Sequence, residues 1–233
     1  MNERINIVAV PDQPGWRAVT ARGSPAGTAG LRPINPFEVG AAELTLFVKP
    51  RWRRRGIGSR LLAAVREQTT EPRLVVDVEA GSPGEAFCLR HGFRHTGSRR
   101  HDLLIFCDVH QAWLAELIDA DHPGYRLIHW TGDLPGHSVL TAAEASGDLA
   151  AYAMAEVGAP TRQYGPAVRP GHRGRRLDLW VNAALIKRLR DIHPHITEIE
   201  TATAEDDHQL LAARRHLGFR PHRRTRLYEL ALS

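Results

Sequence analysis

A run of arginine and glycine after a strand-like segment is the part of this sequence best suited to chemistry. Residues 48–62 are Val-Lys-Pro-Arg-Trp-Arg-Arg-Arg-Gly-Ile-Gly-Ser-Arg-Leu-Leu. The first N–H groups of a helix lack backbone partners and carry a partial positive charge, and glycine lets a ligand approach the backbone closely. The neighbouring arginines add charge. This segment therefore predicts a loop that holds a pyrophosphate at a helix N-terminus.

The flanking segments are the elements that must position such a loop. Residues 42–48 favour β-structure and end before Pro50, which predicts a strand. Leu61, Leu62 and Val65 recur at helical spacing after the loop. The sequence further predicts an early strand, a flexible turn of small residues, a second strand and a second helix that ends at a glycine (16–22, 24–30, 73–78, 83–91 and Gly92).

With these flanks, Arg53-Arg54-Arg55-Gly56-Ile57-Gly58 resembles the acyl-CoA-binding motif Arg/Gln-x-x-Gly-x-Gly/Ala of the GNAT acetyltransferase superfamily. The likeness extends over residues 16–106. It implies acetyl-CoA or another acyl-CoA as co-substrate and no metal. It also implies that strand amides pair with pantetheine and loop amides hold the pyrophosphate, which gives the cofactor-binding residues Phe47, Val48, Arg53, Arg54, Arg55, Gly56, Ile57, Gly58 and Ser59. The alternative is a βαβ unit whose glycines merely cap a helix.

The second half of the chain repeats this order. Residues 168–178 align with residues 48–58 without a gap, and Gly218-Phe219 answers Gly92-Phe93. A repeat of this length predicts tandem domains: a first domain over 1–106, a connector over 107–137 and a second domain over 138–233. The chain is similar to two-domain actinobacterial GNAT proteins of the mycothiol synthase type. The expected fold class is α/β, with tandem GNAT-like domains, each a mixed, mostly antiparallel sheet flanked by helices.

The two copies differ at the glycine positions, where the second copy has Arg176 and Asp178. A carboxylate near phosphates is unfavourable in a partly desolvated site. Asp178 could instead cap its own helix or pair with Arg175. We expect that the second copy does not bind CoA in the standard way.

The resemblance also locates catalytic candidates. Glu43 lies five residues before Val48, where many GNAT enzymes have a general base, and the second copy has Gln163 there. Cys88 stands where the family usually has a tyrosine general acid, and Arg214 is its counterpart. A thiol with an ordinary pKa can protonate a leaving thiolate. The alternatives are an ordinary polar strand residue for Glu43 and a small core side chain for Cys88.

His101 and Asp102 are the candidates for substrate contact, because they lie near the strand pair that lines the acceptor site in GNAT folds. The other histidines are expected at the surface or in loops. His193-Pro194-His195 lacks a third ligand at a suitable spacing, so no metal site is expected.

Composition limits the class of protein. The chain has 233 residues and a formal charge of +5, from 31 basic and 26 acidic residues. That charge suits a polyanionic ligand such as CoA. Two cysteines and no apolar leader or membrane-length segment predict a cytoplasmic protein without disulfides. The basic segment 220–226 is expected to be solvated; an acidic partner such as RNA or a carrier protein is the alternative.

The acceptor side is expected to be shorter than in a complete GNAT domain, because the residues before 16 are too few for the strand and two helices that begin such a domain. A shortened acceptor side could leave an open site for a large substrate. Alternatively, the other copy or a second subunit of a homodimer could complete the site. The expected function is acyl transfer from acyl-CoA to a primary amine of a small molecule, without nucleic acid or membrane partners. The alternatives are a non-catalytic acyl-CoA-binding protein and a carrier- or tRNA-dependent acyltransferase.

Overall fold

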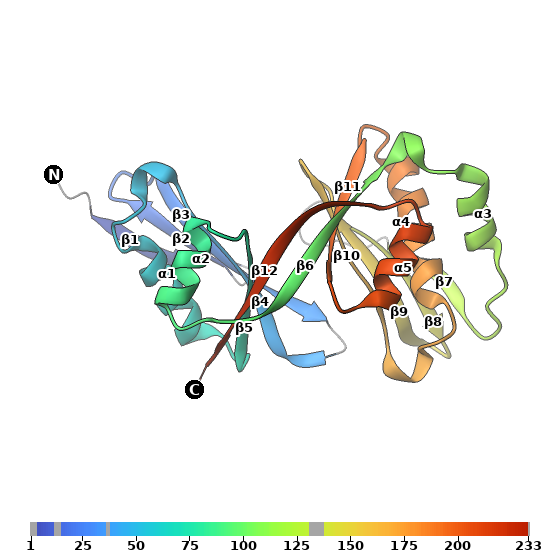
Figure 1. The fold of residues 1–233 in the computed structure, drawn as a ribbon, viewed down its shortest axis with the longest axis horizontal. Coiled ribbons are helices and arrows are strands. Elements are labelled where there is room, and N and C mark those ends of the chain that lie inside the picture. Colours follow the sequence, from blue (N-terminus) through green and yellow to red (C-terminus); the bar gives the residue numbers. More distant parts are fainter. Residues whose placement is uncertain (1–3, 12–14, 36–37, 131–137, 233) are drawn as a thin grey trace. The chain divides into compact units, whose positions relative to one another are not determined.

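The chain forms two compact units. A computed structural model describes residues 4–11, 15–35, 38–130 and 138–232. Unit 1 consists of residues 1–97 and 226–233, and unit 2 of residues 98–225 (Figure 1). Each is a mixed, mostly antiparallel sheet flanked by helices, which confirms the predicted fold class.

Unit 1 orders its strands β1-β2-β3-β4-β5-β12. Neighbouring strands are antiparallel except for the parallel pair β4 and β5. The elements are β1 (Ile5–Ala9), β2 (Gly15–Thr20), β3 (Pro25–Asn35), β4 (Glu38–Val48), a 3₁₀ turn η1 (Pro50–Trp52), α1 (Ile57–Gln68), β5 (Arg73–Val78), α2 (Pro83–Arg90) and β12 (Arg220–Ala231), whose residues from Arg226 belong to this unit.

The apolar pattern of the sequence explains the core of unit 1. Ala42 and Leu44 alternate with polar residues along β4 and are buried. Leu61 and Val65 lie one helical turn apart on α1, and both are fully buried against the strands. The strand over 73–78 and the helices after residues 56 and 82 lie where the sequence predicts them. Among the described residues, no helix is long and apolar enough to cross a bilayer.

The predicted flexible turn over residues 24–30 is wrong, because β3 begins at Pro25. Within it, Gly27 pairs with Val48, and a Cβ at Gly27 would lie 2.7 Å from the carbonyl oxygen of Phe47. A small-residue segment is needed here because β3 and β4 approach closely. Composition alone cannot distinguish that requirement from flexibility.

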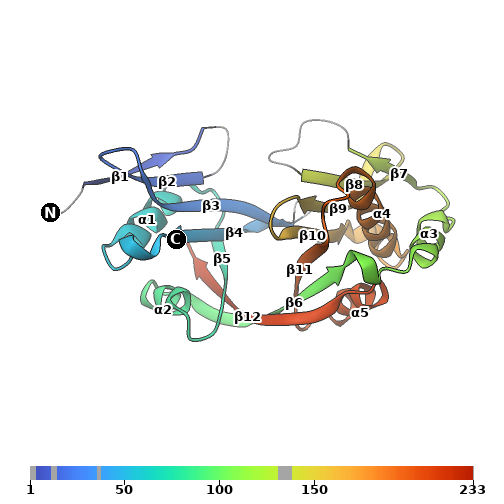
Figure 2. The same cartoon turned by 90° about the horizontal axis from the view of Figure 1, so that it is seen from above.

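Unit 2 orders its strands β6-β11-β10-β9-β8-β7, again with one parallel pair, β10 and β11. Helix α3 lies beside α4 (Figure 2). The elements are β6 (Arg94–Ile105), a 3₁₀ turn η2 (Phe106–Asp108), α3 (Gln111–Asp119), β7 (Arg126–His129), β8 (Ser138–Ala145), β9 (Asp148–Glu156), β10 (Thr161–Val168), a 3₁₀ turn η3 (Pro170–His172), α4 (Leu177–Ile192), β11 (Glu198–Ala204) and α5 (His208–His216).

The expected connector, residues 107–137, contains α3 and β7. Its last residues, 131–137, lie outside the described residues. Residues 10–14 separate β1 from β2 in unit 1, and residues 130–137 separate β7 from β8 in unit 2. The expected shortening of the acceptor side stays a prediction.

The last strands of the two sequence copies are exchanged. Residues 226–231 of β12 pair antiparallel with β5 in unit 1, whereas residues 99–105 of β6 pair antiparallel with β11 in unit 2. The units therefore follow strand pairing rather than chain order, so their bounds differ from the expected domain bounds. The division of the sequence into two copies with a connector stays a prediction.

Glu85 of α2 ties the C-terminal strand into unit 1. Its carboxylate accepts hydrogen bonds from the Tyr228 hydroxyl (2.7 Å), the Gly81 amide (2.6 Å) and the Arg226 guanidinium (2.7 Å). These bonds, that of Tyr228 above all, lower the pKa of Glu85 to about 2.

We expect Glu85→Gln to remove an acid-sensitive part of the stability. A lowered folded-state pKa stabilises the protein above the ordinary value of 4.5, and this stabilisation is lost as pH falls from about 4.5 to 2. Thermal unfolding at pH 6 and pH 3 should therefore show a larger loss of Tm in the wild type than in Glu85→Gln. Glu67→Gln, at an exposed carboxylate of α1, should behave as the wild type. Equal losses in all three proteins would contradict this role of Glu85.

Candidate functional site

The predicted phosphate loop has an open backbone at the start of α1. Gly56 is the N-cap residue, with φ of 74° in the left-handed region, and no side chain caps the helix. The first intrahelical bond runs from the Arg60 amide to the Gly56 carbonyl. The amides of Ile57, Gly58 and Ser59 therefore precede the helical hydrogen-bond pattern and are oriented to receive an anion.

The two glycines of the loop serve different purposes. No atom lies within 4 Å of the place that a Cβ would take at Gly56, so this side of the loop faces open space. A Cβ at Gly58 would lie 3.0 Å from Cε2 of Phe87 on α2. Gly56 is therefore required by its φ angle, whereas Gly58 is required by the packing of α1 against α2.

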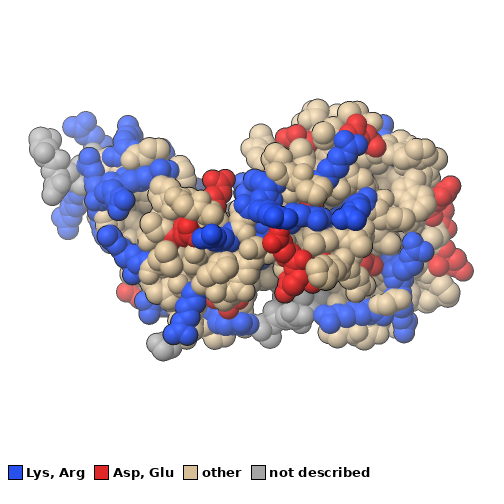
Figure 3. Space-filling model, in the orientation of Figure 1, with Lys and Arg blue, Asp and Glu red and all other residues tan. Residues whose placement is uncertain are grey.

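The loop arginines are exposed but partly organised. Arg53 Nε donates to the Val48 carbonyl at 3.1 Å, which ties the loop to the end of β4. The Arg55 guanidinium lies 5.0 Å from the ring centroid of buried Trp52. Arg54 has φ of 63°, an uncommon value for a residue with a Cβ. Basic side chains gather around α1 in the surface view (Figure 3).

Ser59 has a side-chain partner that the sequence did not indicate. Its Oγ lies 3.0 Å from Nε2 of His91, the C-cap residue of α2. Desolvation, followed by the charges of Arg90 and Arg66, lowers the pKa of His91, which favours the neutral imidazole. The contact joins the first turn of α1 to the end of α2.

Strand β4 stops pairing with β5 just before the residues that the sequence predicts to contact pantetheine. It pairs in parallel with β5 only at Ala42–Leu74 and Glu43–Val75, while its pairing with β3 continues to Val48. Phe47 is 53% exposed. The end of β4 therefore offers a strand edge that leads into the loop, and an extended ligand could bind along it.

Glu43, the candidate base, lies at the point where β4 and β5 part. Its carboxylate is paired with the guanidinium of Arg32, the residue opposite it on β3. This ion pair must open, or share the carboxylate with an ammonium group, before Glu43 can accept a proton. Arg32 was not identified from the sequence, because its pairing with Glu43 depends on the register of β3 and β4.

Cys88, the candidate acid, is buried in the core of unit 1 and 1% exposed. Desolvation and the charge of Glu85 raise the pKa of its thiol to about 11, so it stays protonated at neutral pH. The thiol thus carries a proton, but its burial favours the alternative of a small core side chain. Its role as an acid stays a prediction.

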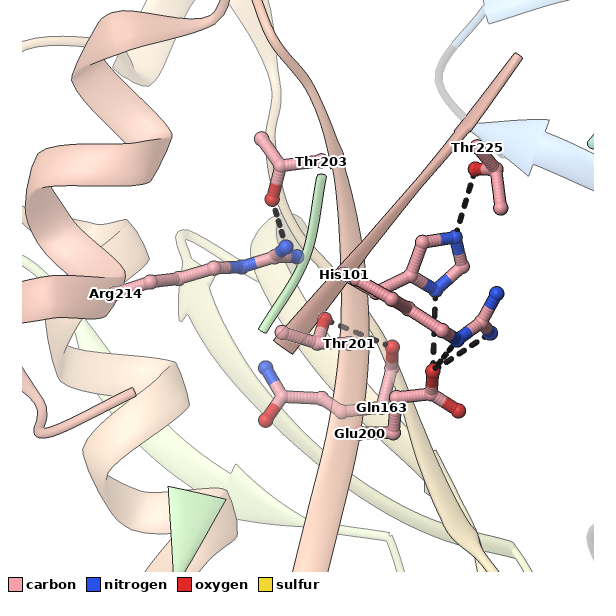
Figure 4. A network of polar contacts seen from close by, with 8 residues as sticks. His101, Gln163, Glu200, Thr201, Thr203, Arg214 and Thr225 are labelled. Carbon is pink, nitrogen blue, oxygen red and sulfur yellow. Dashed lines mark hydrogen bonds and ion pairs between the residues drawn. The ribbon is translucent and has the colours of Figure 1, made fainter. Parts of the chain in front are cut away.

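His101 and Asp102 have protein partners in unit 2, where the chain buries both of them. His101 lies between Glu200 (Nδ1 to Oε1, 3.2 Å) and Thr225 (Nε2 to Oγ1, 2.9 Å), as Figure 4 shows. Asp102 accepts two hydrogen bonds from Arg100, at 2.8 and 3.0 Å. The contacts of His101 join β6 to its neighbouring strands, whereas the Arg100–Asp102 pair lies within β6. The predicted substrate contact of both residues stays a prediction.

The second copy has the same loop backbone with the glycine moved. Gly174 and Arg176 have φ of 78° and 58°, whereas Arg54 and Gly56 have 63° and 74°. Each loop thus needs two left-handed residues, and each fills only one of these positions with glycine. Arg175 is held by the Tyr125 hydroxyl at 2.5 Å rather than by Asp178.

Asp178 fits its position because its neighbour is small. Ala213 stands in unit 2 where Phe87 stands in unit 1, and Asp178 and Ala213 line the same groove. Arg176, the N-cap residue of α4, makes no side-chain cap, and Asp178 lies in the first turn of that helix. At the base position, Gln163 is buried and donates to Asn182 at 2.7 Å.

Residues 13–95 match the family model described as "Acetyltransferase (GNAT) domain". A search of curated protein sequences found no match at a significant level. This match identifies a GNAT acetyltransferase domain over residues 13–95, and together with the fold and the loop geometry it supports the predicted N-acetyltransferase class.

Solved structures extend the likeness in fold over the whole chain. A tandem GNAT protein from the clavulanic acid biosynthesis pathway is 23% identical, with a TM-score of 0.60, covering 97% of this chain and 85% of that one. A GNAT-like protein from Streptococcus suis is 15% identical, with a TM-score of 0.60, covering 91% of this chain and 86% of that one. A putative acetyltransferase from Pyrococcus horikoshii is 14% identical, with a TM-score of 0.58, covering 96% of this chain and 75% of that one.

We expect Arg176→Gly to stabilise unit 2. A residue with a Cβ at φ of 58° is strained, and glycine removes that strain at the cost of a more flexible unfolded chain. The net gain should be about 0.5–1 kcal/mol in the free energy of unfolding. The control is Arg173→Gly in the same loop, where φ is −64° and glycine relieves no backbone strain, so this variant should gain no stability. Urea denaturation measures both; a gain for Arg173→Gly or a loss for Arg176→Gly would contradict the argument.

Proposed function

We propose that the chain is an acyl-CoA-dependent N-acyltransferase that transfers an acetyl group from acetyl-CoA, in unit 1, to a primary amine of a small molecule. The observation that carries this proposal is the loop before α1, where an open left-handed glycine, uncapped amides and exposed arginines adjoin a free strand edge. The GNAT domain match covers the same residues.

The residues present fit the chemistry of the donor. Open space beside Gly56 leaves the amides of Ile57, Gly58 and Ser59 accessible to a pyrophosphate, and Arg53 and Arg54 provide positive charge. The strand edge at Phe47 and Val48 would pair with the amides of pantetheine. Acetyl-CoA supplies the acyl group as a thioester, and a backbone N–H near Val48 would polarise its carbonyl.

Glu43 is the proposed base for the amine. Its carboxylate would take the ammonium proton, directly or through a water, once the amine competes with Arg32 for it. Arg32 would then hold the carboxylate in place rather than neutralise it. Cys88 is proposed as the proton donor to the departing thiolate; if it only packs in the core, solvent supplies this proton.

A non-catalytic acyl-CoA-binding protein is the second candidate. The observations that favour it are the burial of Cys88 and the Arg32–Glu43 ion pair. It would have the same donor site but no turnover with any amine. The assay below separates it from the enzyme.

A carrier- or tRNA-dependent reaction finds less support. Basic residues of the 220–226 segment are paired with carboxylates (Arg220 with Asp108, Arg223 with Glu200, Arg224 with Glu205 and Arg226 with Glu85). Acidic side chains accordingly lie among basic ones in Figure 3. Charge that is neutralised internally attracts a polyanion weakly. We also propose a cytoplasmic location, where cysteines stay free as both are here, and a homodimer.

Acetyl-CoA titrated calorimetrically into the wild type should bind at one site per chain. Gly56→Asp should abolish this binding, because it places a carboxylate where the phosphates would lie. Asp178→Gly, at the position in unit 2 that corresponds to Gly58, should leave the binding unchanged. Failure of the wild type to bind would refute the proposed function.

Glu43→Gln should lower kcat by about 10²–10⁴-fold, as expected for loss of a general base. The affinity for acetyl-CoA should stay unchanged, since the substitution is outside the phosphate loop. The assay measures release of CoA with a panel of primary amines. Glu67→Gln, at an exposed carboxylate of the same unit, is the control. Turnover by neither the wild type nor the variants would favour the non-catalytic candidate.

A further inference from the structure

Unit 2 contains a second place where two parallel strands part. Strand β10 pairs with β11 from Thr161–Ile199 to Gln163–Thr201 and no further. Beyond this point β10 is irregular, with Gly165 at φ of 77° and a register shift against β9 between Tyr164 and Ala167. The carbonyl of Gly165 therefore needs a hydrogen-bond donor other than β11.

Arg214 of α5 supplies that donor. Its NH2 donates to the Gly165 carbonyl at 2.9 Å, and its NH1 donates to Oγ1 of Thr203 on β11. One guanidinium therefore bridges the two strands beyond their last pair. Figure 4 shows the side chain of Arg214 extending from its helix towards Thr203.

The bridge is buried, which is uncommon for an arginine. Arg214 is 1% exposed, and desolvation lowers the pKa of its guanidinium to about 10, while the charges of Asp102 and Asp207 oppose that shift. The group remains charged at neutral pH. A buried cation is costly unless it is hydrogen-bonded, so its two bonds across the gap are a substantial part of what holds it there.

In the described part of unit 1, Cys88 stands at the position that corresponds to Arg214. Cys88 and Arg214 both stand four residues before the glycine of a Gly-Phe pair. The thiol of Cys88 is short and is buried in the core of unit 1. A ligand that enters the gap beside β4 would therefore meet a strand edge, whereas the gap beside β10 already contains a guanidinium.

We propose that Arg214 is an internal strut that fills the strand gap of unit 2 and excludes a ligand from it. The identity of the excluded ligand, the pantetheine arm of an acyl-CoA, rests on the proposed function. Unit 2 is then closed as a donor site by this side chain, independently of Asp178, and the chain accepts one acyl-CoA.

Two matched cysteine reporters test this closure. Thr203→Cys and Asp77→Cys each lie two residues beyond the last residue of their strand that pairs with the preceding strand. Both are made with Cys107→Ser, which removes the exposed thiol. With DTNB, Cys at 77 should react at least tenfold faster than Cys at 203. Equal rates would overturn the strut.

Removal of the guanidinium should then open the gap of unit 2. In the Thr203→Cys protein, Arg214→Ala should raise the labelling rate at least tenfold, whereas Arg215→Ala, at the exposed neighbouring arginine, should not. An unchanged rate in folded Arg214→Ala would refute the proposal. If Arg214→Ala does not fold, the comparison of the two reporters with Arg214 intact decides.

Acetyl-CoA separates this inference from the proposed function. It should protect Cys at 77 from labelling and leave Cys at 203 unaffected. Lack of protection at 77 would refute the donor site in unit 1 but would leave the proposal about Arg214 unaffected. Protection at 203, or two binding sites per wild-type chain, would refute the strut.

Discussion

The early end of a parallel strand pair is the constraint on which this protein depends. In both units the strand before the arginine-rich loop pairs with its parallel neighbour over a few residues and then continues with only its antiparallel neighbour beside it. Backbone groups left by such a break must find partners, because an unpaired buried group costs as much as a lost hydrogen bond. Unit 2 meets this need with a side chain of its own, the guanidinium of Arg214. In unit 1 the same position has a short thiol, and the strand edge leads directly into the open loop before α1, for which we propose phosphate binding.

The loop geometry is a property of the backbone that different side chains can support. Both loops have two left-handed residues before the helix, although the glycine is second in unit 1 and first in unit 2. The residue type in the first turn of the helix depends on the side chain packed against it. Gly58 faces Phe87 in unit 1, whereas Asp178 in unit 2 shares a groove with Ala213. Unit 2 therefore has the same loop backbone without the glycine motif of unit 1, and its loop presents different side chains at the surface.

Polar contacts of two carboxylates, one on a helix and one on a strand, organise the strands that the two copies exchange. Glu85 binds Tyr228 and Arg226 in unit 1, and Glu200 binds His101 and Arg223 in unit 2. These carboxylates neutralise arginines that, in the sequence, form a basic segment. The positive formal charge of the chain is thus a poor guide to how much free positive charge its C-terminal strand presents.

Local signals in the sequence determined most of the helices and strands and the glycine-bearing loop before α1, because strand propensity, helical periodicity and glycine placement act over a few residues. They also located Glu43, Cys88 and their counterparts by position. Tertiary structure alone decided that residues 25–30 form a strand, that Glu43 meets Arg32, that β12 pairs with β5, and that Arg214 lies between β10 and β11. Each of these depends on register or packing between segments distant in the chain, and a single sequence does not encode such contacts in any local pattern.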